Sequence, residues 1–311
     1  MIDVTLLGTA ALMPLPERAL TAAALTCAGH TLLFDCGEGT QTAARRARVS
    51  LMKIDGIALT HYHGDHIFGL PGLLQTLGSL GRVAPLWIAG PADIAQALAP
   101  VLLLAERQPY EIRLLTLPPE GLALDECCGW PAGAQLSAFP TEHRVPSQGY
   151  VFTLPRSGKF LPERARALGV PVRRWGELQR GLPVEADGRL VPPEAVLGPA
   201  RPGLKFVFSG DTSACPALEN AARDADLLIC EATYGENEQA QMAGDYGHMN
   251  FAQAGALAAR AGCKRLWLAH YSQMVKEPAD YLDNTRAYFP EAECGADGMA
   301  LTLRFPEEAC P

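Results

Sequence analysis

Short apolar runs alternate with helix-like patterns along most of this chain, beginning at its first residues. The runs have the length of buried strands, and Gly-containing turns follow the first of them. We expect strands at Val4–Leu7, Thr31–Phe34, Gly56–Thr60, Leu86–Ala89, Lys205–Phe208, Asp226–Cys230 and Arg265–Leu268. We expect helices at Glu38–Arg48, Pro71–Leu80, Ala92–Leu104, Pro216–Arg223 and Phe251–Ala261. Strands that alternate with helices in this way predict a layered α/β fold.

The alternation breaks at about residues 152–200, where Pro and Gly are frequent. Between Arg156 and Arg180 seven Lys or Arg residues stand against two acidic ones, in a chain whose net charge is −8. A solvated excursion from the core would account for this composition. Because its charge is opposite in sign to that of the rest of the chain, we favour a surface that attracts phosphate groups.

The composition narrows the class of protein. Hydrophobic residues make up 48% of the 311 residues and charged residues 19%, which argues against intrinsic disorder and for a large buried core. The nine cysteines include no Cys-x-x-Cys, so we expect neither a zinc finger nor a disulfide framework. No apolar run reaches the roughly 18 residues of a membrane helix. We therefore expect a soluble, cytoplasmic protein.

The strongest chemical signal is Thr60-His61-Tyr62-His63-Gly64-Asp65-His66, directly after a predicted strand. In extended backbone, residues i and i+2 point the same way, so His61 and His63 can chelate one ion. Gly64 permits a tight turn that brings Asp65 and His66 toward a second ion. Imidazole and carboxylate donors together suit zinc, with manganese or iron as alternatives.

Three further candidate ligands are His143, Asp211 and His270. Each one, taken alone, could equally be a filler residue in the core or in a turn. Each follows a strand-like run, however, and α/β folds place their sites at the carboxyl ends of strands. We expect no role in the site for His30, on an apparent hairpin turn.

These motifs together resemble the metallo-β-lactamase superfamily and, within it, the ribonuclease Z family, which matures the 3′ end of transfer RNA. Besides His61–His66, the resemblance rests on Phe34–Gln41, Gly69–Leu74, His143 with Gly149-Tyr150, Ser209–Thr212 and Ala269-His270. It spans nearly the whole chain. It implies one domain over residues 1–311, with a four-layer αβ/βα sandwich fold and a tRNA-binding arm at about 152–200.

The resemblance also implies two Zn²⁺ ions per subunit, with Mn²⁺ as the alternative, and a homodimer. His61, His63 and His143 would hold the first ion, and Asp65, His66 and His270 the second. Asp211 would bridge both ions. Asp35 would orient a ligand rather than bind metal itself.

The expected reaction is attack of a metal-bridging hydroxide on phosphorus, with Asp65 as proton acceptor. His248 matches the residue that protonates the leaving oxygen, and Glu231 would orient and charge that imidazole. The alternatives are a surface histidine at a helix start and a solvated carboxylate at a strand end. The basic residues Lys159, Arg173 and Arg174 of the arm, with Arg18, are the candidate substrate contacts.

Four departures from the family pattern concern Ala19, Val172, Cys230 and Met274. Ala19 replaces an Asn after Arg18, and Met274 stands where an Arg would offer bidentate contacts to phosphate. None of the four removes a predicted ligand. The first hypothesis is therefore a precursor-tRNA endonuclease. The alternatives are a phosphodiesterase for a small or different nucleic-acid substrate, and a zinc-binding protein without catalysis.

Overall fold

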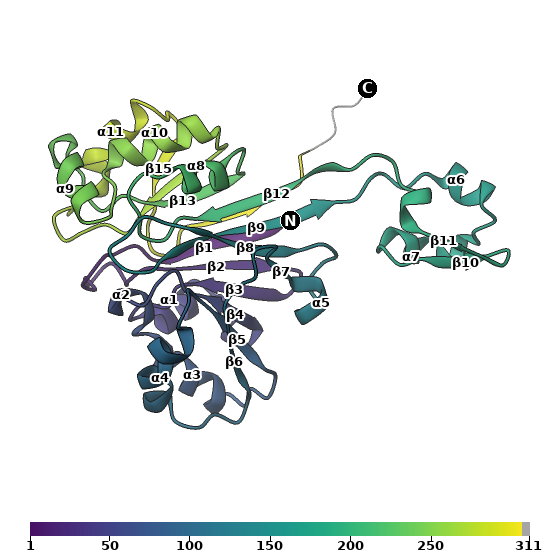
Figure 1. Cartoon of the computed structure of the whole chain (residues 1–311), viewed down its shortest axis with the longest axis horizontal. Helices are drawn as coiled ribbons and strands as arrows, with labels where there is room; N and C mark the ends of the chain where they lie inside the picture. Colours follow the sequence, from purple (N-terminus) through teal and green to yellow (C-terminus); the bar gives the residue numbers. More distant parts are fainter. Residues whose placement is uncertain (307–311) are drawn as a thin grey trace.

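Two mixed sheets, stacked face to face, form the centre of the molecule in the computed structural model, which describes residues 1–306 (Figure 1). The first sheet has the strand order β16-β1-β2-β3-β4-β5-β6. Its strands are β1 Ile2–Gly8, β2 Ala22–Cys27, β3 His30–Phe34, β4 Ile54–Ala58, β5 Leu86–Ala89, β6 Ile112–Leu115 and β16 Ala300–Leu303.

The second sheet has the strand order β15-β14-β13-β12-β9-β8-β7. Its strands are β7 Leu122–Ala123, β8 Gln135–Pro140, β9 Gln148–Arg156, β12 Arg201–Phe208, β13 Leu227–Glu231, β14 Leu266–Ala269 and β15 Ala292–Cys294. Strands β3 to β6 run parallel in the first sheet, and β12 to β15 in the second. The carboxyl ends of parallel strands share one edge of a sheet, and this edge carries the site.

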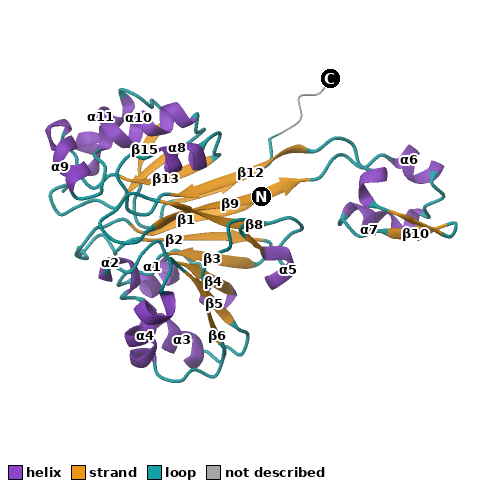
Figure 2. Ribbon diagram, viewed as in Figure 1, coloured by secondary structure: helices purple, strands orange, loops and turns teal. Residues whose placement is uncertain are grey.

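Helices cover the outer face of each sheet, as the purple and orange ribbons of Figure 2 show. Those on the first sheet are α1 Thr40–Arg46, α3 Leu70–Ser79 and α4 Ile94–Ala105. Those on the second are α8 Pro216–Ala222, α10 Phe251–Ala261 and α11 Leu282–Arg286. The short helices α2 Gly64–Ile67, α5 Leu124–Cys128 and α9 Ala240–Asp245 complete the body. The predicted four-layer αβ/βα sandwich is confirmed.

Apolar periodicity explains how these layers pack. Leu70, Leu73, Leu74 and Leu77 of α3 recur every three or four residues, and all four are fully buried against the first sheet. A second apolar core, which includes Phe34, fills the space between the sheets. A third apolar core fills the space between the second sheet and the helices α8, α10 and α11. Each sheet therefore buries both of its faces.

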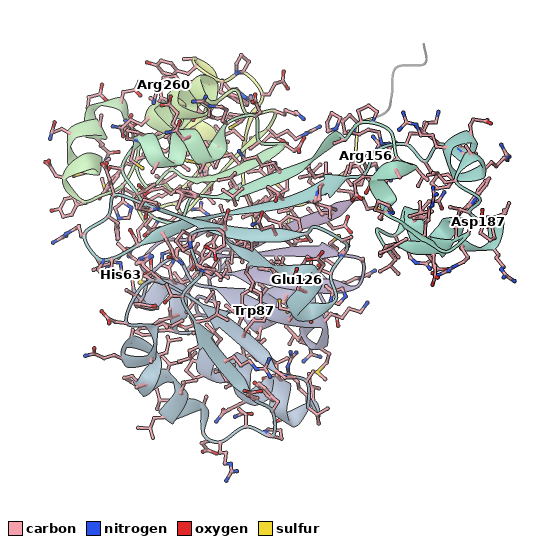
Figure 3. The ribbon with its side chains drawn as sticks, turned by 45° about the vertical axis from the view of Figure 1, so that its right-hand side comes forward. His63, Trp87, Glu126, Arg156, Asp187 and Arg260 are labelled. Atoms are coloured by element: carbon pink, nitrogen blue, oxygen red, sulfur yellow. The ribbon has the colours of Figure 1, made fainter. Side chains whose placement is uncertain are left out.

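The segment between β9 and β12 leaves the body as an arm, defined here as residues 157–200. It contains α6 Pro162–Ala167, α7 Trp175–Gln179, β10 Val184–Ala186 and β11 Arg189–Val191, and it has a small apolar core of its own. In Figure 3, Arg156 marks the root of the arm, Asp187 lies at its far end, and His63 lies on the opposite side of the body.

Some elements differ from the expected ones. Helix α1 begins at Thr40 rather than Glu38, and β12 begins at Arg201 rather than Lys205. The apolar pattern missed β2, whose Ala-rich sequence has little intrinsic strand preference, because pairing with β1 and β3 stabilises it instead. No helix among residues 1–306 is long and apolar enough to cross a membrane. The eight cysteines in this part are free thiols, and Cys310 lies outside it.

Candidate metal centre

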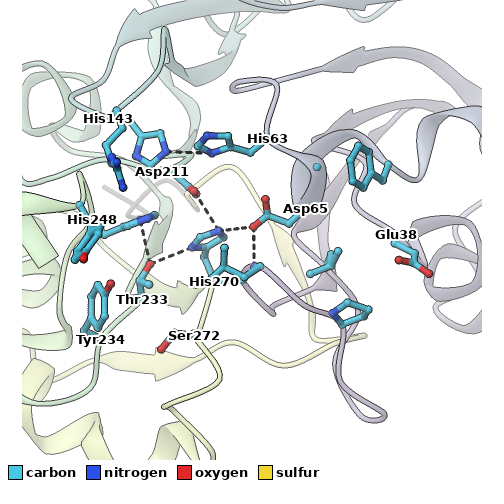
Figure 4. A pocket seen from close by; sticks show the side chains of 18 residues that line it. Glu38, His63, Asp65, His143, Asp211, Thr233, Tyr234, His248, His270 and Ser272 are labelled. Carbon is cyan, nitrogen blue, oxygen red and sulfur yellow. Dashed lines mark hydrogen bonds and ion pairs between the residues drawn. The ribbon is translucent and has the colours of Figure 1, made fainter. Parts of the chain in front are cut away.

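Seven candidate ligands converge at the edge where the two sheets approach each other, and five of them line a pocket of about 660 Å³ (Figure 4). The other two, His61 and His66, are fully buried and do not line it. The first sheet contributes the residues that follow β4, where His61 and His63 lie before α2 and Asp65 and His66 within it. The second sheet contributes His143 after β8, Asp211 after β12 and His270 after β14. Residues up to 209 positions apart in the chain (61 and 270) therefore share one site.

One group of donors consists of His61, His63, His143 and Asp211, whose ligand atoms lie within 4.8 Å of one another. His63 Nδ1 is 2.9 Å from His61 Nε2 and 3.3 Å from His143 Nε2. Ligand atoms about 2.0–2.1 Å from a tetrahedral ion are roughly 3.3 Å apart. These nitrogen atoms therefore have the spacing that one divalent ion requires.

The second group consists of Asp65, His66 and His270. His270 Nε2 lies 3.2 Å from His66 Nε2 and 3.5 Å from Asp65 Oδ2. Asp211 connects this group to the first, because its Oδ2 is 3.3 Å from His66 Nε2, 3.2 Å from His270 Nε2 and 3.7 Å from His61 Nε2. The structure thus brings all seven predicted ligands together, although their role as ligands stays a prediction.

Hydrogen bonds on the far side of four of the five rings, those of His61, His66, His143 and His270, fix which nitrogen faces the centre. His66 Nδ1 donates to Asp35 Oδ2 at 2.7 Å, and His143 Nδ1 donates to the Gly247 carbonyl at 2.8 Å. In the same way, His61 Nδ1 contacts the Thr60 hydroxyl and His270 Nδ1 the Thr233 hydroxyl, both at 3.0 Å. Each bond leaves the Nε2 lone pair free to bind a metal.

Asp35 orients more of this centre than a single ring. Its fully buried carboxylate accepts the Thr60 amide at 2.7 Å and the Thr60 hydroxyl at 2.8 Å, in addition to His66. Both Asp35 and His270 adopt positive φ angles, of 57° and 60°, which side-chain-bearing residues rarely occupy. Strained backbone of this kind is often found at functional sites.

The donor set is that of a divalent-metal site. Asp211 Oδ1 is buried and has no hydrogen-bond partner among the described residues. A buried, unpaired carboxylate oxygen is costly, and coordination would satisfy it. Burial by itself raises the pKa of Asp65, but a hydrogen bond with His270 and the charge of His66 lower it by more. Asp65 therefore remains an anionic donor at neutral pH.

A histidine–carboxylate pair lies beside the two donor groups. His248 Nδ1 donates to Glu231 Oε1 at 2.9 Å, and the His248 ring stacks on that of His270 with 5.6 Å between centroids. Glu231 is buried, and it also accepts from the Thr212 amide and the Thr233 hydroxyl. Burial alone lowers the pKa of His248, but the Glu231 charge raises it by more, to about 9. At neutral pH this imidazole carries a proton that it can donate.

The predicted substrate contacts lie outside this pocket. Arg18 donates to the carbonyls of Val275 and Lys276 and lies over the Tyr271 ring, so it supports the loop after His270. In the arm, Lys159 and Arg173 are exposed, whereas Arg174 forms an ion pair with Glu177 at 2.9 Å. The structure does not bring these residues together with the donor groups.

Sequence reasoning missed Thr60, Thr233 and Gly247 as supports of the centre. Thr60 opens the quoted motif that ends at His66, and Thr233 lies two residues after the candidate Glu231, so the position of each hydroxyl was a signal that could have been followed. Gly247 gave no such signal. It supports His143 through its backbone carbonyl across 104 positions of chain, a contact that only tertiary structure creates.

Comparison with known proteins identifies the family. Residues 27–243 match the model of the metallo-beta-lactamase superfamily. Ribonuclease Z of Lachnoclostridium phytofermentans is 40% identical, over 98% of this chain and 99% of its own length. Ribonuclease Z of Agathobacter rectalis is 41% identical, over 99% and 100%. The solved structure of human tRNase Z, short form, is similar with a TM-score of 0.67 and 27% identity, covering 97% of this chain and 100% of its own. This chain therefore belongs to the metallo-beta-lactamase superfamily and, within it, to the ribonuclease Z family.

Proposed function

We propose that this chain is a zinc-dependent endonuclease that removes the 3′ trailer from precursor tRNA. The observation that carries the proposal is the position of Asp211 between two donor groups, which together offer five imidazoles and two carboxylates. This set suits two Zn²⁺ ions, with Mn²⁺ as the alternative. Such a pair, when bound, activates water as a nucleophile and neutralises a phosphate oxygen.

In this proposal the chain's own residues hold the ions and move protons. His61, His63 and His143 would hold one ion, and Asp65, His66 and His270 the other. Asp65 Oδ2 also accepts the Leu12 amide at 2.8 Å, which fixes the orientation of the carboxylate at the pocket wall, where it would accept a proton. His248, oriented by Glu231, would protonate the leaving 3′ oxygen.

The first experiment is cleavage of a 3′-extended precursor tRNA by the purified, zinc-loaded protein. We expect two zinc ions per chain and a cut directly after the discriminator base. Asp65→Ala should bind less zinc and lose cleavage by at least about 100-fold. Asp283→Ala, an exposed aspartate of α11, is the matched control and should behave like the wild type.

Bis-p-nitrophenyl phosphate serves as a parallel substrate in that experiment. Hydrolysis of this small diester without cleavage of the precursor would contradict the tRNA substrate. It would favour a phosphodiesterase for a small or different nucleic-acid substrate. Full zinc loading with neither activity would favour a zinc-binding protein without catalysis.

His248→Ala should separate proton donation from metal chemistry. We expect kcat on precursor tRNA to fall by about 10²–10⁴-fold, because a ribose oxygen leaves as a strong base. Hydrolysis of bis-p-nitrophenyl phosphate should change far less, because nitrophenolate leaves without a proton. His30→Ala is a suitable control, since His30 pairs with Asp55 at 2.7 Å outside the pocket. Equal losses on both substrates would refute the acid role.

The cations of the arm are proposed to bind the tRNA backbone. We combine Lys159→Glu, Arg173→Glu and Arg174→Glu in one variant. It should bind precursor tRNA more weakly, and the slope of log affinity against log salt should fall by the equivalent of about three phosphate contacts. The control carries the same charge change at exposed cations of the body, as Lys53→Glu, Arg107→Glu and Arg304→Glu. Unchanged affinity of the arm variant across a salt series would refute the assignment.

A homodimer completes the proposal. The arm and the donor groups lie at opposite ends of the long axis of the chain (Figures 1 and 3), so a second subunit could present its arm to an RNA held at this site. Leu80, after the last residue of α3, and Leu103 and Leu104, at the end of α4, are exposed apolar side chains that a second subunit could cover. Sedimentation equilibrium should give twice the chain mass of 33.3 kDa, and the mass of a single chain would contradict the dimer.

A further inference from the structure

The side chains that line the catalytic pocket include more acidic residues than Lys or Arg residues. Glu38, Asp65 and Asp211 line it, and Arg144 is the single Lys or Arg among its described lining residues. An RNA strand that enters this pocket brings several phosphates, whereas the donor groups can serve the one that is cleaved. The protonated His248 also lines the pocket, but its proton is assigned to the leaving oxygen, so Arg144 is the cation that remains for a neighbouring phosphate.

Arg144 is held in place without being neutralised. Its guanidinium lies over the Tyr246 ring, with Cζ 5.4 Å from the ring centre, a cation–π arrangement. Arg144 is exposed, and within residues 1–306 it forms no ion pair and no hydrogen bond through its side chain. Its five N–H donors thus remain available in the fork geometry that matches two oxygens of a phosphate.

The loop that carries Arg144 and the loop that carries Tyr246 are in close contact at Gly247. A Cβ at this position would lie 2.9 Å from His143 Cα, and φ is +73°, so a larger residue would push the loops apart. The His143–Gly247 hydrogen bond closes the same contact. Arg144 therefore directly follows one candidate metal ligand, and Tyr246 lies two residues before the candidate acid His248.

Arg18, which contacts the loop after His270, cannot supply the same contact. Arg18 is committed to two carbonyls of the loop after His270 and to the face of Tyr271. At position 274 the chain offers an exposed Met, which has no donor. Arg144 is thus the one Lys or Arg residue that lines the pocket, and its guanidinium donors are uncommitted within residues 1–306.

We propose that Arg144, supported by Tyr246, binds a non-bridging oxygen pair of the RNA phosphate adjacent to the one that is cleaved. Arg144 would thus position the substrate strand. This contact would favour a polynucleotide, which has a second phosphate, over a small phosphodiester, which has none. The inference rests on the proposed endonuclease function and adds to it the group that holds the strand beside the cut.

The test compares Arg144→Ala, Arg144→Lys and the control Arg107→Ala, an exposed arginine that does not line the pocket. For Arg144→Ala we expect KM for precursor tRNA to rise about 10-fold and the salt slope to fall by about one charge. Its kcat should stay within about twofold, and hydrolysis of bis-p-nitrophenyl phosphate should not change. Arg144→Lys should keep the salt slope but raise KM in part, because an ammonium binds as a point charge.

Three outcomes would overturn the inference. The first is a wild type that cuts precursor tRNA while Arg144→Ala retains its KM and salt slope. The second is an equal loss of kcat on both substrates together with lost zinc, which would place the effect on His143. The third is a wild type that binds zinc and cuts only the small diester, and this one would overturn the proposed function as well.

Discussion

The buried carboxylate of Asp211 is the interaction on which the centre depends. Asp211 follows a strand of the second sheet. Its Oδ2 lies close to ring nitrogens of His61 and His66, which follow β4 of the first sheet, and of His270, which follows β14 of its own sheet. A buried charge must be paired, so the two sheets can approach at this edge only with the histidines in place. The same oxygen relates the two donor groups, and one residue therefore sets both the packing of this edge and its chemistry.

The local part of this arrangement could be predicted from the sequence. The spacing of His61, His63, Asp65 and His66 determines which side chains can converge, because a strand end and one helical turn allow few alternatives. The rule that sites follow parallel strands then added Asp211 and His270. Strand β2 could not be predicted from its composition, because pairing with β1 and β3 stabilises it as a strand.

What could not be predicted depends on contacts between distant loops. Arg18 looks like a substrate contact in the sequence, yet its guanidinium is occupied by backbone carbonyls more than 250 positions away. Arg144 attracts no notice in the sequence, yet the contact at Gly247 places it beside the pocket with its donors free. Side-chain type is readable along a chain, but whether a charge is already paired is a property of the folded structure.

The distribution of charge then suggests an order of events for the proposed reaction. With a net charge of −8, the chain as a whole repels a polyanion, whereas the arm, with seven Lys or Arg residues against five Asp or Glu, presents an excess of cations. Binding through the arm would hold the RNA close enough for its end to enter the pocket, where one arginine and the metal ions replace the lost hydration. Recognition and catalysis are thus separated in space, which explains how a site lined by Glu38, Asp65 and Asp211 can serve a strand of phosphates.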